Sequence, residues 1–448
     1  MMTPSLPPQR ATAVLDMPPL FGAIQNLLLA RRSRVILLLI AALALLLSLA
    51  LHMQVVLSSS GVWSDLHAYG IQADSVFRHQ NVYTVTDRYP YPPVWIWIIA
   101  LARWVSVTFG MKFDIAARVP AIIGDLALAL LLLRFAWRRF GACCLALVPM
   151  LLFALNPLAI LISAGHGQFD ALVIFFLLLA VYLWGEKQNE RIIWGALALG
   201  MAIALKGYPA LALPYFVFSA PRGSRLRLTA ASFVPLVVSV LIYCALFGVS
   251  PHMLSNVLGY QSTPDLGWGF LLDKAGLANA TVGTILRYVA EALILLFAVF
   301  GPAALFRGRP VVALVAVFSV FYALTYTMSV QYIFWILPFL CLALPVWSLI
   351  YTVVGLFAAV SFYLPRYPAA LPTSSPWRHA LALFGVSRSF GVAALIGVSA
   401  LLALYAMISA SSRSPALSSR LPAWLKPYLA LALENSGSPS PTGEGAGG

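Results

Sequence analysis

The sequence predicts an all-α polytopic membrane protein, and three observations support this fold class. Hydrophobic residues make up 61% of the 448 residues and charged residues only 9%, whereas a soluble domain usually carries about 25% charged residues. Apolar runs of roughly 20 residues, enough to cross a hydrocarbon core about 30 Å thick, recur along almost the whole chain. Shorter segments of alternating hydrophobicity, which would indicate a β-barrel, are not seen in the sequence. Because backbone polar groups must pair within each segment in lipid, the apolar runs are predicted to be helices.

Twelve apolar segments are candidate spanning helices. The first begins at residue 35, and its apolar core is too long for a signal peptide, so we expect an uncleaved spanning helix. The segment 207–220 is short, and Pro345 divides a long apolar stretch into the two helices around it. The twelve segments are residues 35–57, 119–137, 142–163, 169–185, 191–206, 207–220, 228–248, 285–306, 310–328, 331–346, 347–364 and 390–410.

One more apolar stretch, residues 93–109, fits either a spanning helix or an amphipathic helix in the membrane interface. It contains Arg103 and begins at a pair of prolines. Lys and Arg favour short cytoplasmic loops, and the interfacial reading places the basic clusters on one side of the membrane. We therefore predict an interfacial helix. The clusters are Arg31, Arg32 and Arg34; Arg134, Arg138 and Arg139; Arg222, Arg225 and Arg227; Arg307 and Arg309; and Arg413, Arg420 and Lys426.

The formal net charge of +14 is explained by this topology, so nucleic acid is not an expected partner. The charge distribution predicts that both termini are cytoplasmic in a multi-pass protein of the cell membrane. The outer loop 365–389 disagrees with the rule, because it carries Arg366, Arg378 and Arg388. Contact with lipid phosphate is the only explanation that the sequence offers for these three residues.

The topology divides the chain into three parts. Residues 1–34 are predicted to be a cytoplasmic N-terminal segment, and residues 35–410 to be the transmembrane domain. The cytoplasmic tail, residues 411–448, is rich in Ser, Gly and Pro near its end and is expected to be disordered from about residue 435. The two long outer loops of the transmembrane domain are residues 58–118 and 249–284.

Polar residues from several distant segments converge on the outer side in this topology. Ionisable groups at membrane depth are costly and usually mark a function, so their shared placement indicates a functional site. The segments are residues 64–69 (Ser-Asp-Leu-His-Ala-Tyr), 88–93 (Arg-Tyr-Pro-Tyr-Pro-Pro), Arg118 with Asp125, 165–170 (Gly-His-Gly-Gln-Phe-Asp), 206–209 (Lys-Gly-Tyr-Pro) and 329–332 (Ser-Val-Gln-Tyr).

Each of these residues also has a purely structural explanation. Asp65 could be a solvated loop acid or a helix cap. Arg118 and Asp125 are seven residues apart, share a helix face and could form a structural pair, while Lys206 could extend its amine to the membrane surface. The other candidates with such an alternative are His166 and Gln168, as caps, and Tyr89, Tyr91 and Trp95, as an interfacial aromatic belt.

The order of these segments resembles the GT-C superfamily of membrane glycosyltransferases. The resemblance extends from about residue 35 to 338 and is closest to glycosyltransferase family 87 and the polyprenyl-phosphate-mannose-dependent mannosyltransferases. The same segments also resemble those of the mannosyl- and glucosyltransferases of the endoplasmic reticulum. Three segments carry it: Asp65 and Tyr69 followed by Asn81-Val82-Tyr83 and Tyr91-Pro92-Pro93; residues 165–170, similar to a His-Phe-Gln-Tyr-Asn element; and residues 331–338, similar to a Gln-Tyr…Pro element.

The resemblance implies a GT-C-like bundle of about 12 transmembrane helices, with a long first outer loop that carries interfacial helices. It implies that Asp65 is the catalytic base and that Arg88, Arg118 and Lys206 hold the carrier phosphate. Only one acid stands at the first-loop position, so a divalent metal, which prefers several oxygen ligands, is not supported and no cofactor is expected. The remaining residues expected to bind substrate are Tyr69, His166, Gln168, Asp170, Tyr208, Gln331 and Tyr332.

The function expected from the residues and the resemblance together is an inverting glycosyl transfer on the outer face of the membrane. The donor is a polyprenyl-phosphate-linked sugar, with mannose implied by the resemblance, and the acceptor is a hydroxyl of a glycan, glycolipid or protein. The main alternative is a transporter or flippase of lipid-linked sugars, which requires polar residues at mid-membrane depth. A structural membrane protein without chemistry is a third reading, and it would tolerate Asp65→Ala.

Overall fold

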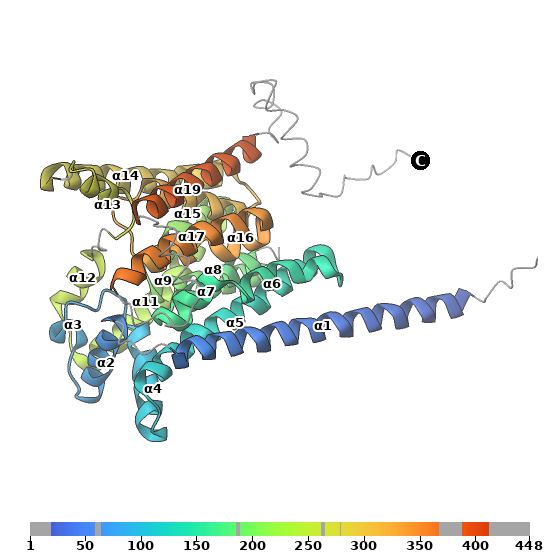
Figure 1. The fold of residues 1–448 in the computed structure, drawn as a ribbon, viewed down its shortest axis with the longest axis horizontal. Coiled ribbons are helices and arrows are strands. Elements are labelled where there is room, and N and C mark those ends of the chain that lie inside the picture. The colour runs from blue at the N-terminus through green and yellow to red at the C-terminus, as the bar shows by residue number, and fades with distance from the viewer. Residues whose placement is uncertain are drawn as a thin grey trace, which may run out of the picture.

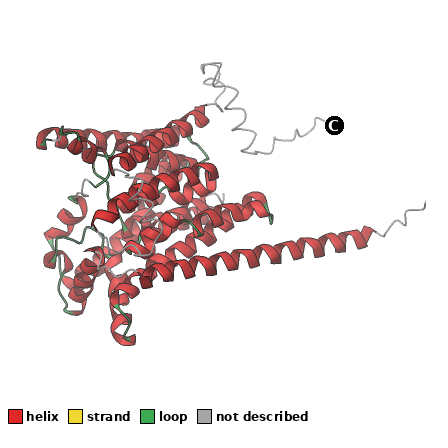
Figure 2. Ribbon diagram, viewed as in Figure 1, coloured by secondary structure: helices red, strands yellow, loops and turns green. Residues whose placement is uncertain are grey.

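The computed structural model describes residues 19–58, 64–184, 189–260, 265–277, 279–366 and 388–411. Helices form almost all of its regular structure (Figure 2), and within these ranges the β pairing is limited to an isolated bridge between Leu266 and Met328. The predicted all-α fold class is therefore confirmed. The predicted tail disorder from residue 435 and Arg378 lie outside the described residues.

Seven described segments are long and apolar enough to cross a membrane, so the chain is a multi-pass membrane protein. On α1, Leu39, Leu43 and Leu46 are exposed, as expected of side chains that face lipid. The segments are the part of α1 (Pro19–Ser58) from Arg34, α5 (Phe113–Phe140), the broken segment Cys144–His166, α11 (Arg225–Phe247), α14 (Ala280–Leu305), α17 (Pro345–Arg366) and α19 (Arg388–Ser411).

The other apolar helices of the described chain are shorter than a full membrane span, so the count of twelve stays a prediction. Two of them begin with a short 3₁₀ turn. They are α4 (Val94–Phe109), α8 (Asp170–Trp184), α9 (Asn189–Leu205), η3 (Tyr208–Ala212) with α10 (Leu213–Ser219), α15 (Pro310–Leu324), and η5 (Val330–Phe334) with α16 (Leu337–Ala343).

The segment predicted as one helix over 142–163 is broken at residues 155–156 and changes helix type twice. It consists of η1 (Cys144–Leu147), α6 (Val148–Ala154), α7 (Pro157–Ile160) and the π-helix η2 (Leu161–His166). Pro157 cannot donate a backbone hydrogen bond, and the Asn156 side chain accepts from the amides of Leu158 and Ala159 to restart the helix. The Asn156 amide also donates to the Thr352 hydroxyl at 2.7 Å, which fixes the break against α17.

Two glycines allow central helices to approach closely. A Cβ at Gly124 of α5 would lie 2.6 Å from the Leu172 amide nitrogen of α8, and one at Gly200 of α9 would lie 2.3 Å from the Ser232 carbonyl oxygen of α11. Both distances are too short for any side chain. Helix α8 packs against both α5 and α9, and the ion pair of Asp170 with Lys206 joins the N-terminal end of α8 to the C-terminal end of α9.

Short helices gather at one end of the bundle (left in Figure 1), where α1 ends. The long helix α1 runs along the bundle, whereas α4 runs across its direction. Asp74 of α2 and Arg103 of α4 form a two-pronged ion pair at 2.8 and 3.2 Å, which ties α4 to the same end. The location of α4 at a membrane surface stays a prediction. The short helices are α2 (Ser64–Phe77), α3 (Val82–Val85), α12 (Pro251–Leu258) and α13 (Trp268–Lys274).

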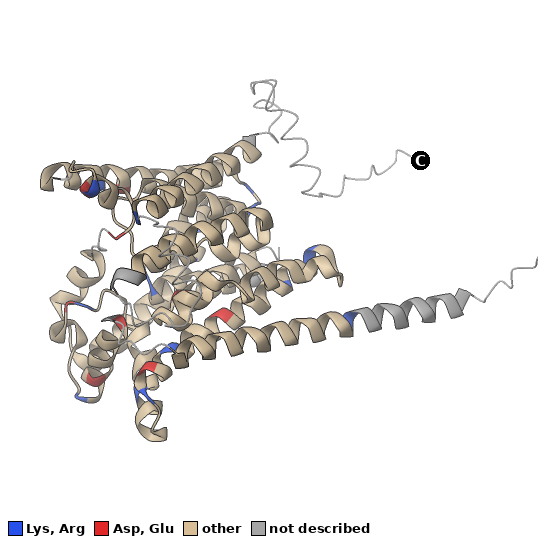
Figure 3. Ribbon diagram, in the orientation of Figure 1, with Lys and Arg blue, Asp and Glu red and all other residues tan. Residues whose placement is uncertain are grey.

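The two ends of the described bundle differ in the charges they carry. Acidic and basic residues lie together at the α2 end, while the opposite end carries basic residues (Figure 3). Arg138 and Arg139 close α5 there, and Arg309 precedes α15. Arg388, one of the basic residues that broke the charge rule, contacts the Asp265 carboxylate at 3.3 Å. A protein ion pair therefore explains its position without lipid phosphate.

Candidate active site

The carboxylate of Asp65 lies at the centre of the polar cluster on the α2 end. Asp65 is the second residue of α2, and its side chain is 29% exposed. Its Oδ2 lies 3.1 Å from His166 Nε2 and accepts a hydrogen bond from the Gln168 amide. Its Oδ1 is 3.8 Å from Arg88 Nη2, and the Arg88 side chain is 52% exposed. Three residues from two predicted segments, 88–93 and 165–170, therefore converge on one partly accessible carboxylate.

These partners hold Asp65 in its ionised form. Desolvation alone would raise the pKa of Asp65, but the hydrogen bond and charge of His166, with the charges of Arg88 and Lys206, bring that pKa below its ordinary value. Since the ionised carboxylate accepts, His166 Nε2 carries a proton. The Tyr363 hydroxyl makes a hydrogen bond with His166 Nδ1 at 2.9 Å, so α17 fixes the ring orientation.

The backbone conformation of residues 161–168 positions His166 and Gln168 next to the Asp65 carboxylate. Residues 161–166 form a π-helix, a rare arrangement that is frequent at functional sites. Gly167 ends it with φ of 81° in the left-handed region, which non-glycine residues avoid. A Cβ at Gly167 would also lie 2.8 Å from the Leu66 side chain and 3.2 Å from Arg118. Glycine is thus required here by both conformation and space.

A group of aromatic side chains packs near Asp65. Trp95 and Phe169 stack with ring centroids 3.8 Å apart, and Tyr91 meets Phe169 edge to face at 5.0 Å. Tyr69 donates from its hydroxyl to the Gln168 side-chain oxygen at 3.4 Å, so Gln168 is oriented with its amide toward Asp65. Desolvation and the nearby Asp65 charge raise the pKa of Tyr69 well above its usual value, which keeps this hydroxyl a donor.

A second acid, Asp170, lies in a closed cluster next to the first. Its side chain is fully buried, and both of its oxygens accept from Lys206 Nζ, at 3.0 and 2.9 Å. Trp335 Nε1 donates to Asp170 Oδ1 at 2.6 Å, and Tyr208 stacks on the Trp335 ring at 3.5 Å. The amine of Lys206 is surrounded by the rings of Tyr91, Phe169 and Tyr332, at 5.5, 5.0 and 6.0 Å.

The cations proposed to hold phosphate differ in accessibility. Arg118 is 2% exposed and donates to the carbonyl oxygens of Asp114 and Gly165, both at 3.2 Å. Lys206 is also buried, against Asp170. Among the three candidates, Arg88 alone is exposed. Arg118 therefore supports the loop that carries His166, and Lys206 influences Asp65 through its charge.

The alternative pairing of Arg118 with Asp125 is wrong. Asp125 instead accepts from His52 Nε2 of α1 at 2.9 Å, and His52 Nδ1 contacts the Ser48 carbonyl oxygen at 2.7 Å. Sequence reasoning missed His52, although a lone histidine within an apolar run was a usable signal. Tyr363 carried no such signal, because aromatic residues are common in spanning helices, and Trp335 lies within the predicted element 331–338 but was given no role. Gln331 is buried in η5, next to Tyr332, and is not among the contacts of the Asp65 carboxylate described above.

Sequence comparisons match two groups of known proteins. The family model described as "Alpha-(1->6)-mannopyranosyltransferase, N-terminal domain" matches residues 80–222, a range that includes Arg88, His166 and Lys206 but not Asp65. The chain is also 29% identical over 223 residues to dolichyl-phosphooligosaccharide-protein glycotransferase 1 of Archaeoglobus fulgidus. That alignment covers 46% of this chain and 34% of the relative, so the chain spans about a third of the length of that protein.

A comparison with solved structures also gives a match. The structure of ArnT from Cupriavidus metallidurans bound to undecaprenyl phosphate superposes with a TM-score of 0.48 and 16% sequence identity. The superposition covers 83% of this chain and 78% of ArnT.

Proposed function

We propose that this chain transfers mannose from a polyprenyl-phosphate carrier to an acceptor hydroxyl, with inversion and with Asp65 as general base. The premise is its GT-C glycosyltransferase identity, which rests on the family model and the archaeal relative. The observation that carries the proposal is one partly exposed, ionised carboxylate beside an exposed guanidinium. In the proposed orientation both termini are cytoplasmic, and this site faces the outer side of a cell membrane.

Asp65 has the surroundings that base catalysis at this site requires. The acceptor hydroxyl must lose its proton as the new glycosidic bond forms, and a carboxylate within hydrogen-bond reach can take it. His166 and Gln168 fix Oδ2 of Asp65, whereas the contact of Oδ1 with Arg88 is long, at 3.8 Å. Oδ1 is therefore the atom proposed to receive the proton.

Arg88 is proposed to receive the departing phosphate. Cleavage of the sugar–phosphate bond adds negative charge to the carrier phosphate, and a guanidinium can bind it through two parallel hydrogen bonds. Arg88 is exposed and only loosely paired with Asp65, so a phosphate can draw it away at little cost. As Arg88 turns to the phosphate, Asp65 loses a cationic neighbour and becomes more basic. Donor binding and base activation are coupled in this way.

The surroundings of Asp170 support a single displacement. A retaining double displacement needs a second carboxylate as nucleophile. Asp170 is fully buried, and Lys206 and Trp335 bond to its oxygens, so it is unsuited to attack a sugar carbon. Direct attack by the acceptor on the carrier-linked carbon inverts its configuration. Asp170 is instead proposed to orient the aromatic residues next to it, Trp335 and Tyr208, for contact with the sugar.

A donor screen tests the proposal. Purified protein is incubated with radiolabelled mannosyl, glucosyl and arabinosyl polyprenyl phosphates, and transferred sugar and free carrier are measured, with the product configuration determined by NMR. The expected result is transfer from the mannosyl donor with inverted configuration. Retention, or transfer from glucosyl or arabinosyl carrier alone, would overturn the stated mechanism or sugar.

Transport of lipid-linked sugars is the competing function, and one observation favours it. The buried pair of His52 and Asp125 lies inside two spanning helices, where transporters often place ionisable groups. Proteoliposomes loaded with intact donor separate the two functions. Movement of uncleaved donor across the bilayer, without release of free carrier, would support transport and contradict transfer.

A further inference from the structure

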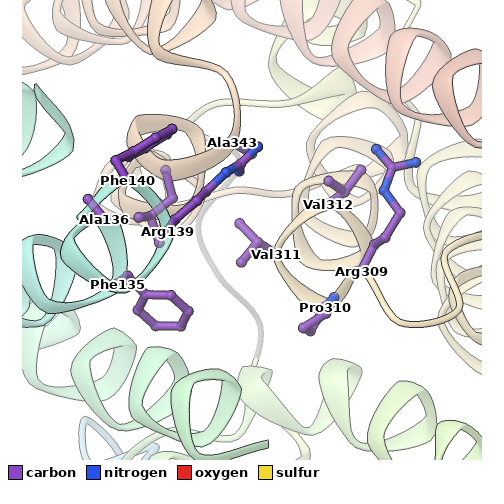
Figure 4. Close-up of a pocket in the computed structure, with 10 residues that line it drawn as sticks. Phe135, Ala136, Arg139, Phe140, Arg309, Pro310, Val311, Val312 and Ala343 are labelled. Atoms are coloured by element: carbon purple, nitrogen blue, oxygen red, sulfur yellow. The ribbon is translucent and has the colours of Figure 1, made fainter. Parts of the chain in front are cut away.

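A cavity of about 320 Å³ lies at the end of the bundle opposite Asp65. It opens between the last turns of α5, the first turn of α15 and the end of α16 (Figure 4). Its volume is in the range of small-molecule sites. The proposed glycosyl transfer does not use it. The apolar residues that line it include Phe135, Phe140, Val311, Val312, Leu342 and Ala343.

Two arginines give this cavity a cationic rim. Arg139 extends from α5 across its opening, and Arg309 flanks it from the start of α15 (Figure 4). None of the described residues lining it is acidic. Arg309 Nη1 donates to the Ser409 carbonyl oxygen at 3.3 Å, and the Arg139 guanidinium lies 5.3 Å from the Phe140 ring centroid. A guanidinium has five N–H donors, so these contacts are compatible with bonds to an anion.

The start of α15 adds to the positive potential. Pro310, at its first position, and the next two residues line the cavity. The first amides of a helix have no partner within it, and the helix dipole places positive charge at this end. The helix has 15 residues, which is long enough for this effect. Arg139, Arg309 and the N-terminal turn of α15 therefore border one cavity whose other lining residues are apolar.

The depth of the cavity identifies the kind of anion. The spanning segment of α5 ends at Phe140, and that of α14 ends at Leu305, just before Arg309. The rim thus lies where the apolar helix surface ends, and a phospholipid phosphate would lie at that level. The apolar lining would add no binding energy for a soluble anion, but it can contact the first part of an acyl chain.

We propose that this cavity binds an anionic glycerophospholipid, with its phosphate between Arg139 and Arg309 and the start of an acyl chain against Val311 and Leu342. The site is independent of the proposed glycosyl transfer and lies at the other membrane surface. Such a lipid would tie α5, α15 and α16 together, since each contributes to the lining.

The test measures lipid binding to the full-length protein. Delipidated protein in phosphatidylcholine nanodiscs is titrated with short-chain phosphatidylglycerol, and bound lipid is counted by native mass spectrometry. Arg139→Gln and Arg309→Gln should each weaken phosphatidylglycerol binding about tenfold, the effect of one charged hydrogen bond. Arg227→Gln is the matched control, because Arg227 is exposed and basic but does not line the cavity.

A second variant guards against misfolding, since Arg309 also contacts Ser409. Ala343→Phe keeps both arginines and fills the cavity with a ring, and it should remove phosphatidylglycerol binding. Inorganic phosphate should compete poorly. Equal weakening by Arg227→Gln, unchanged binding in Ala343→Phe, or displacement of phosphatidylglycerol by inorganic phosphate at comparable concentration would each overturn the lipid site.

Discussion

Asp65 and Asp170 lie at the same end of the bundle but in opposite surroundings. Asp65 is partly exposed, and its contact with the nearest arginine is long. Asp170 is fully buried, and Lys206 and Trp335 bond to it at 2.6–3.0 Å. A buried, fully paired acid stabilises a structure, whereas a partly exposed acid with one weakly held oxygen is available to react. Accessibility separates these two roles where residue type cannot.

The largest effect expected from this contrast is on stability at the Asp170 cluster. Lys206→Met leaves a buried carboxylate without its cation and should lower the free energy of unfolding by about 3–5 kcal/mol. Asp65→Asn should change it by less than about 1 kcal/mol, because its arginine pair is partly solvated. Thermal denaturation in detergent, followed by tryptophan fluorescence, measures both.

The double variant Asp170→Leu with Lys206→Met sharpens this prediction. It removes both charges together and should recover most of the stability lost in Lys206→Met. If the single Lys206 variant is as stable as wild type, Asp170 is not the structural acid described here.

The second effect separates the exposed arginine from the buried one. Arg88→Gln should lower kcat/KM for the donor by about tenfold to a hundredfold, the loss of one or two charged hydrogen bonds to phosphate. Its melting temperature should stay unchanged. Arg118→Gln should instead lower the melting temperature, because it removes bonds to the Gly165 and Asp114 carbonyls. The reverse pattern would exchange the roles of the two arginines.

The third effect is a pH dependence of the reaction. Because the pKa of Asp65 is lowered, its ionised form is present throughout the neutral range and above the ordinary carboxyl pKa of about 4. Activity, and the stability that the ionised carboxylate contributes, should be lost only as the pH falls through the lowered value. In His166→Ala the acid limb of kcat/KM should move to higher pH. An unmoved limb would mean that another group sets it.

The smallest effect concerns the orientation of the His166 ring. Tyr363→Phe removes the hydroxyl that contacts His166 Nδ1 and should reduce turnover about fivefold, as expected for about 1 kcal/mol of one neutral hydrogen bond. Tyr322→Phe is the control, because it removes another buried tyrosine hydroxyl, one that bonds to the Tyr332 carbonyl oxygen. Equal losses in both variants would indicate general repacking.

Composition was sufficient to predict the all-α membrane class, because lipid-facing residues such as Leu43 have no place in a soluble fold. It did not predict the π-helix over residues 161–166, because a π-helix depends on tertiary contacts such as that between His166 and Tyr363. The predicted segments did bring Asp65, His166 and Gln168 together. Burial of Arg118 and the pairing of Lys206 with Asp170 could not be predicted, since neither follows from spacing along the chain.

The central claim is that Asp65 removes the acceptor proton, and single-turnover transfer by Asp65→Asn tests it most directly. Asp74→Asn is the matched control, because Asp74 lies on the same helix and pairs with Arg103. Donor affinity is measured separately for each variant. We predict that Asp65→Asn binds the mannosyl donor but transfers its sugar about 10²–10⁴-fold more slowly, while Asp74→Asn stays close to wild type. Wild-type transfer by Asp65→Asn would contradict the account.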